Sequence, residues 1–158
     1  MKTGAEDGGS GVSLLVCGTG GKTIGVPLTA VRETMRPLPL FPVPDIPTFV
    51  LGAARVRGAT VPVLDSGLLT GGEPVAATRW ITLAASNERT VALAVASVAG
   101  VRTLSPADLE ALPPLLAGSG PQLFTAVAVR DQQLLLALEA SHLVPDEVWA
   151  RLAEVTSS

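Results

Sequence analysis

The chain has little of three things that restrict what a protein can do: cysteine, aromatic side chains and an excess of one charge. Its one cysteine, Cys17, excludes an internal disulfide, as is typical of cytoplasmic proteins. Tyrosine is absent, and only two Trp and three Phe side chains are present, so aliphatic residues must fill the core. Eleven basic and fourteen acidic side chains give a net charge of −3 without a basic block. This balance disfavours nucleic acid and anionic membrane surfaces as partners.

Long apolar runs are also absent. The longest nearly unbroken one, Val91–Val101, is far shorter than the roughly 20 residues that span a bilayer, so no membrane insertion is predicted. Residues 1–11 lack the apolar segment of a secretory signal and are expected to form a flexible polar tail. These observations predict a cytoplasmic protein.

Residue types that perform chemistry are few and scattered. His142 is the only histidine, and Cys17 alternates with apolar residues without a basic neighbour that would activate the thiol. The acidic residues fall in different predicted loops and strands, so they suggest no paired-carboxylate site: Glu33, Asp45, Asp65, Asp108, Glu110 and Glu139. We therefore predict no catalytic residue, no metal site and no cofactor.

Short strand patterns dominate what is present. Strands are predicted at 12–17, 22–26, 79–85, 89–95, 98–104, 123–130 and 133–138. The predicted helices are small: a helical turn within 27–34, about two turns from Ser105, and an amphipathic helix over 146–155. A chain of 158 residues suits one domain. Many short strands joined by turns favour a mostly β fold of closed or nearly closed barrels.

Two segments invite alternative interpretations. Five prolines within 37–47 predict a rigid surface connection, although Pro39–Pro42 and Pro44–Pro47 also match the PxxP pattern of SH3 ligands. Gly18–Thr23 ends like a phosphate-binding Walker A loop, which would indicate a small nucleotide-binding enzyme. However, the first glycine of that motif is replaced by Val16, and a strand rather than a helix is predicted to follow. A hairpin turn is the alternative interpretation.

The most distinctive stretch is Phe49–Asp65, in which two short apolar runs meet at Arg57-Gly58. It resembles the signature of the CheW family, the coupling proteins of bacterial chemotaxis. In that signature a strand ending Asn-Leu-Arg-Gly turns into a second strand reading Val-Pro-Val, a hydrophobic residue and Asp, which Val61–Asp65 matches. The resemblance extends from about Ser13 to about Val144.

The resemblance implies a fold that the pattern alone does not show. CheW-like domains consist of two small five-stranded β-barrels of SH3-like shape packed side by side. We therefore expect one CheW-like domain over 12–145 with two intertwined barrel subdomains, the second at about 78–136. A C-terminal amphipathic helix and tail are expected over 146–158.

The resemblance also implies a function. It indicates a non-catalytic adaptor that couples chemoreceptors, the methyl-accepting chemotaxis proteins, to a CheA-type histidine kinase. The cytoplasmic hairpin tip of the receptor would lie in a groove between the barrels, and the regulatory domain of the kinase would bind one barrel face. Other CheW-like domains are further candidate partners. The implied location is the cytoplasm, at receptor arrays on the inner membrane.

Candidate contact residues follow from the matching positions. The resemblance implies a receptor-binding set of Val31, Glu33, Arg57, Gly58, Val98 and Val101, in which Glu33 and Arg57 are expected to lie close together. It implies a kinase-binding set of Val61, Val63 and Asp65.

The chain departs from the family pattern at several positions. Arg55 replaces the usual asparagine, and Ala96-Ser97 stands where Asp-Gly is common. Ala126 and Ala128 occupy a stretch that is usually glycine-rich, and Ala137 stands about where the last strand carries Asp. An alternative is therefore a divergent CheW-like regulator that binds only one of the receptor, the kinase or another CheW-like protein.

Overall fold

The fold was analysed in a computed structural model, which describes residues 12–85, 89–104, 124–130, 133–138 and 144–157. Strands make up most of these residues, which confirms the mostly β prediction. The strands are β1 Val12–Gly18, β2 Thr23–Pro27, β3 Val31–Met35, β4 Val50–Val56, β5 Ala59–Asp65, β6 Arg79–Ala84, β7 Thr90–Val95, β8 Ser97–Leu104, β9 Phe124–Arg130 and β10 Gln133–Leu138. The helical elements are the 3-10 turn η1 Leu28–Ala30 and the helices α1 Ser66–Leu69 and α3 Asp146–Ser157.

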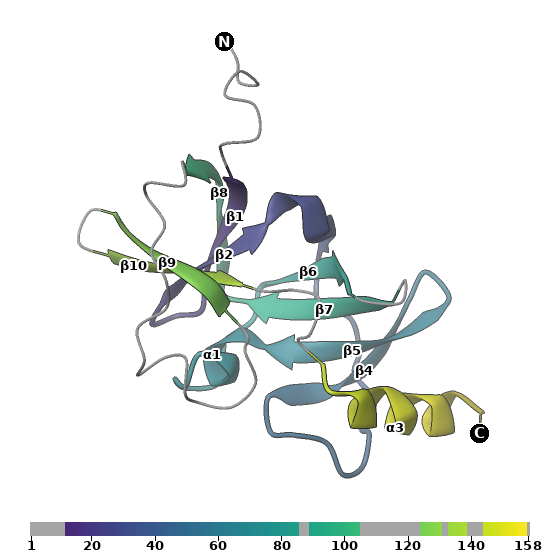
Figure 1. The fold of residues 1–158 in the computed structure, drawn as a ribbon. Helices are drawn as coiled ribbons and strands as arrows, with labels where there is room; N and C mark the ends of the chain where they lie inside the picture. The colour runs from purple at the N-terminus through teal and green to yellow at the C-terminus, as the bar shows by residue number, and fades with distance from the viewer. Residues whose placement is uncertain (1–11, 86–88, 105–123, 131–132, 139–143, 158) are drawn as a thin grey trace.

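The strands form two five-stranded sheets (Figure 1), the number that the resemblance implied. One has the order β8-β1-β2-β10-β9, and the other has the order β3-β6-β7-β5-β4. Both sheets have the same polarity pattern, with a single parallel pair between the third and fourth strands, β2 with β10 and β7 with β5. Each sheet therefore repeats the same arrangement, but the first is built from both ends of the described chain.

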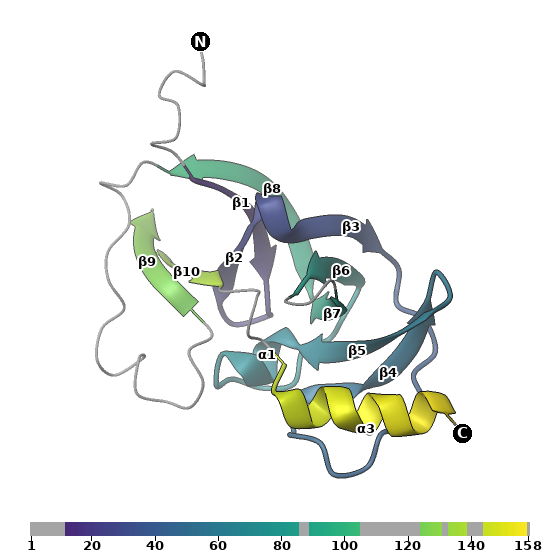
Figure 2. The ribbon, with the colours of Figure 1, turned by 45° about the vertical axis from the view of Figure 1, so that its right-hand side comes forward.

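The strands of the segment expected for the second barrel, 78–136, are divided between the two sheets. The segment 78–136 does not form one sheet: β6 and β7 pair with β3 and β5, whereas β8, β9 and β10 join β1 and β2. The chain is divided in this way because β8 pairs with β1, which is distant in sequence, and not with its neighbour β7. Figure 2 shows β8 continuing from β7 and crossing to lie beside β1.

The core consists mainly of aliphatic side chains, as the shortage of aromatics requires. β7 is buried on both faces: Val91, Leu93 and Val95 point into the larger cluster, and Ala92 and Ala94 into the smaller one. The larger cluster joins both sheets and α3. The smaller one is formed by β4, β5, β6 and β7, with Trp80 as its largest side chain.

Several local predictions are confirmed. β1 and β2 form a hairpin, as do β6 with β7 and β9 with β10. Residues 37–47 contribute no strand, only an isolated bridge from Phe41 to Ala53. The C-terminal helix is present as α3, with Val148 and Leu152 buried.

Other local predictions fail or lie outside the described residues. The helical turn predicted within 27–34 is limited to Leu28–Ala30, because β3 begins at Val31 and pairs with β6. Tertiary pairing therefore outweighs the helical spacing of Leu28, Val31 and Met35. The helix predicted from Ser105, the tail 1–11 and His142 lie outside the described residues.

Candidate interaction site

The candidate site begins at the tip of the β4–β5 hairpin. Val56 pairs with Ala59, so the turn consists of the two residues Arg57 and Gly58. Both have left-handed backbone, with φ of 50° and 82°, which is the conformation of a tight hairpin turn that matches the twist of its strands. A non-glycine residue there costs on the order of 1–2 kcal/mol. The Arg57 side chain is 78% exposed, so solvent and partners can reach it.

Glu33 on β3 receives that arginine. The Nε of Arg57 donates to Oε2 of Glu33 at 2.7 Å, and its Nη2 donates to Oε1 at 2.9 Å. This two-point geometry is the strongest form of arginine–carboxylate pairing. The hydrogen bond from Arg57 lowers the pKa of Glu33 below its usual value, and the same bond raises the pKa of Arg57. The pair thus carries both of its charges at neutral pH.

Thr82 on the neighbouring β6 holds the backbone of Glu33 in place. The amide of Glu33 donates to Oγ1 of Thr82 at 3.1 Å, and the Thr82 hydroxyl donates back to the carbonyl of Glu33 at 3.3 Å. Thr82 is buried. A buried side chain therefore fixes the strand position that presents Glu33 to Arg57.

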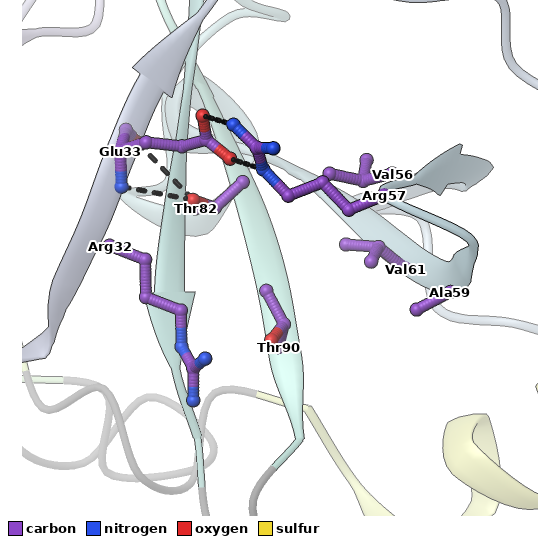
Figure 3. Close-up of a pocket in the computed structure, with 8 residues that line it drawn as sticks. All are labelled: Arg32, Glu33, Val56, Arg57, Ala59, Val61, Thr82 and Thr90. Atoms are coloured by element: carbon purple, nitrogen blue, oxygen red, sulfur yellow. Dashed lines mark hydrogen bonds and ion pairs between the residues drawn. The ribbon is translucent and has the colours of Figure 1, made fainter.

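These residues border a hollow of about 540 Å³ that is open to solvent (Figure 3). Val56 and Val61 supply apolar lining, and Arg32 adds a second guanidinium on the β3 side. The hollow thus combines a short apolar surface with a fixed ion pair. Such a surface can accept a side chain of a partner protein, and the described part of the chain contains no group of three or more metal-ligating side chains.

The structure brings part of the predicted receptor set together. Glu33 and Arg57 are in direct contact, and Gly58 is beside Arg57 in the turn. Val31 starts β3, two residues before Glu33. By contrast, Val98 and Val101 lie on β8, at the edge of the other sheet, and do not line this hollow. They are 36% and 56% exposed.

The structure buries the residues of the predicted kinase set. Val61, Val63 and Asp65 are at most 1% exposed, because β5 lies between β4 and β7 inside its sheet. Val61 and Val63 pack in the cluster that contains Trp80. The Asp65 carboxylate accepts a hydrogen bond from the Leu68 amide and caps α1.

The nucleotide-binding interpretation of Gly18–Thr23 also fails. The segment is the turn of the β1–β2 hairpin, and a strand follows it. The amides of Gly21 and Lys22 donate to Oγ1 of Thr19, and the Lys22 ammonium donates to the carbonyl of Thr70. The groups that would bind phosphate in a Walker A loop already have partners within the chain.

Cys17 is not an activated nucleophile. Its side chain is fully buried, and burial raises the pKa of the thiol to about 12. A protonated thiol is inert in nucleophilic chemistry. Cys17 is part of the core cluster that joins the two sheets.

Sequence reasoning missed a second group of residues beside the hairpin. The Arg89 guanidinium lies over the ring of Trp149, 4.6 Å from its centroid. The amphipathic pattern of the terminal helix predicted its buried face, but it did not predict that Trp149 would contact Arg89. That contact joins the start of β7 to α3.

Comparison with known proteins decides the family. The CheW-like domain model matches residues 13–148. This chain belongs to the CheW-like domain family. It is similar to "Chemotaxis protein CheW" of Rhizobium meliloti (strain 1021), with 27% identity over 139 residues, 87% of this chain and 90% of that protein.

A solved structure has a similar fold. The crystal structure of scaffolding protein TtCheW from Thermoanaerobacter tengcongensis matches with a TM-score of 0.71 and 19% identity, covering 82% of this chain and 90% of that one. The family membership indicates a non-enzymatic CheW-like adaptor of chemotaxis signalling. None of the helices in the described ranges is both long and apolar enough to cross a membrane.

Proposed function

We propose that this chain couples chemoreceptors to a CheA-type histidine kinase in the cytoplasm, at receptor arrays on the inner membrane. The observation that carries the proposal is the ion pair between Glu33 and Arg57 beside an open hollow. An exposed surface pair is worth only about 0–1 kcal/mol of stability. Its fixed two-point geometry therefore suits recognition better than it suits stabilisation.

The turn geometry supports the same proposal. Arg57 has a strained backbone, although Asn or Gly would fit this turn at lower cost. The strain places a guanidinium at the exposed tip of the hairpin, where Glu33 orients it. The receptor hairpin tip is proposed to contact this pair together with Val31 and Gly58.

A second contact is proposed on β8. It is an edge strand, so one side of its backbone has no strand partner among the described residues. The exposed Val98 and Val101 lie along it. Unpaired backbone with apolar side chains is a common basis of association between β proteins, so β8 suits the receptor or another CheW-like domain.

Reconstitution with receptor signalling fragments and kinase tests the proposal. We expect the wild-type chain to co-sediment with both and to raise receptor-controlled autophosphorylation. Arg57→Glu should lose this effect by repelling Glu33, and the exchange Glu33→Arg with Arg57→Glu should recover part of it. Arg36→Glu is the matched control, because Arg36 is exposed but lies outside the hollow.

The outcomes distinguish two adaptors. Binding of receptor or kinase alone, without activation in the three-component mixture, would identify the divergent regulator that the departures at Ala96-Ser97 and Ala137 suggest. Full activity of Arg57→Glu would refute a role for the ion pair. Absence of binding to either protein would refute the proposed function itself.

A further inference from the structure

A second hollow lies on the opposite side of the β4–β5 hairpin tip from Glu33. Its volume is about 480 Å³, and Ala59 lines both hollows. Helix α3 lies beside β4 and β5 (Figure 2), and three of its residues line the hollow: Trp149, Leu152 and Ala153. The lining of the hollow also includes Arg55, Thr60 and Arg89.

The charge of this hollow differs from that of the whole chain. Arg55 and Arg89 line it, and its described lining includes no acidic residue. Neither arginine forms a salt bridge within the described residues. The ion pairs there join Arg57 to Glu33 and Arg151 to Glu154. The complete chain carries a net charge of −3. The hollow is therefore a local positive site on an acidic protein.

The two arginines are oriented rather than free. Arg89 stacks on Trp149 with its guanidinium 4.6 Å from the ring centroid, and Nη1 of Arg55 donates to Oγ1 of Thr60 at 3.4 Å. Each guanidinium has five N–H donors, and these contacts leave most of them available. An oriented guanidinium matches the planar, two-oxygen shape of a carboxylate.

Arg55 departs from the family pattern within the signature stretch. It stands where the family pattern has asparagine, two residues before the turn arginine. That change adds a positive charge to an exposed position. The Arg55 side chain lines the hollow, and it forms no salt bridge with an acidic side chain among the described residues.

We propose that this hollow binds an acidic segment of a partner protein. A Glu or Asp side chain of the segment would pair with Arg55 and Arg89, and a neighbouring apolar side chain would pack on Trp149, which is half-buried. A nucleic acid is a poorer occupant, because two isolated arginines on an acidic chain offer no continuous basic track. The proposal does not depend on coupling between receptor and kinase.

Titration of the full chain with hexaglutamate tests the proposal. The chain has two Trp residues, and their indole N–H signals can be followed by ¹H–¹⁵N NMR at low salt. Trp80 is buried at 2% exposure and serves as the internal reference. We expect a saturable shift of the Trp149 signal that decreases as salt is added, while the Trp80 signal stays in place.

Variants assign the effect to the arginines. Arg55→Asn, which restores the family residue at an exposed position, should weaken hexaglutamate binding roughly fivefold. Arg55→Asn with Arg89→Gln should abolish it. Arg36→Asn should bind like wild type, since Arg36 lies outside both hollows. Because Arg89 contacts Trp149 of α3, its loss could disturb the helix. The Arg55→Asn variant leaves that contact intact and tests the proposal by itself.

Several results would overturn the proposal. One is the absence of a saturable shift of the Trp149 signal with hexaglutamate. The others are a shift in Arg55→Asn as large as in wild type, and a shift with hexalysine as large as with hexaglutamate. Inorganic phosphate that binds as tightly as hexaglutamate would show a general anion site and would also overturn the assignment to an acidic protein segment. Tight binding by a short oligonucleotide would do the same.

Discussion

The buried carboxylate of Asp65 accepts hydrogen bonds from the amide of Val75, ten residues further along the chain, at 3.0 and 3.2 Å. The same carboxylate caps α1 through the Leu68 amide. Asp65 therefore ties the end of β5 to the connection that leads to β6. Its place in the signature stretch is explained by this structural role.

Asp65→Ala should lower the free energy of unfolding by about 2–4 kcal/mol, because it removes a helix cap and leaves the Val75 amide without its partner. Asp65→Asn keeps one carbonyl oxygen and should cost less. Urea denaturation measures both. Equal stability of Asp65→Ala and wild type would contradict the role assigned to the carboxylate.

The ion pair of the candidate site predicts a specific titration. Arg57 lowers the pKa of Glu33 in the folded chain, so the pair stabilises the fold above the ordinary carboxyl pKa of about 4.3. This contribution is lost as the pH falls through the lowered value. In Arg57→Gln, the pKa of Glu33 should rise towards its ordinary value, as measured by ¹³C NMR of the carboxyl group. Arg36→Gln should leave it unchanged.

Gly52 is predicted to be intolerant of a side chain. Its φ is +147°, and a Cβ atom there would lie 2.7 Å from the carbonyl oxygen of Phe41. That carbonyl accepts the amide of Ala53, which fixes the proline-rich connection to β4. Gly52→Ala should therefore cost about 1–3 kcal/mol. Gly21→Ala is the control, since a Cβ atom added to Gly21 would meet nothing within 4 Å and the change should be near neutral.

Core packing predicts a further contrast. Leu83 is fully buried in the cluster that joins the sheets, so Leu83→Ala should cost about 2–4 kcal/mol in thermal or urea unfolding. Leu51 is 40% exposed, and Leu51→Ala should cost much less. If the two variants lost similar free energies of unfolding, Leu83 would not be buried in the core as described.

Local structure was predictable because local chemistry decides it. The short turn rich in glycine between β1 and β2, and the polar segment 86–88 between the apolar runs of β6 and β7, identified two hairpins. The prolines of 37–47 excluded a strand because they lack amide donors. The helical spacing of 27–34 misled, since pairing of β3 with β6 outweighs a weak local preference.

Parts of the candidate site were predictable only through the family resemblance. Glu33 and Arg57 are 24 residues apart, and no periodicity indicates that they meet. The sequence did not show that β5 lies inside its sheet rather than at an edge, because an apolar run looks the same in both places. The contact of Arg89 with Trp149 had no sequence signal beyond the amphipathic terminal helix.

Composition and pattern were enough to establish a mostly β chain without a predicted catalytic residue, because strand preference, turns and the scarcity of reactive side chains are properties of short segments. Strand order, the division into two sheets with the same strand arrangement and the two hollows beside the β4–β5 hairpin tip required the folded chain. They depend on pairing between distant strands, for which the free energy comes from burying both faces of β7 and from hydrogen bonds that no single segment contains.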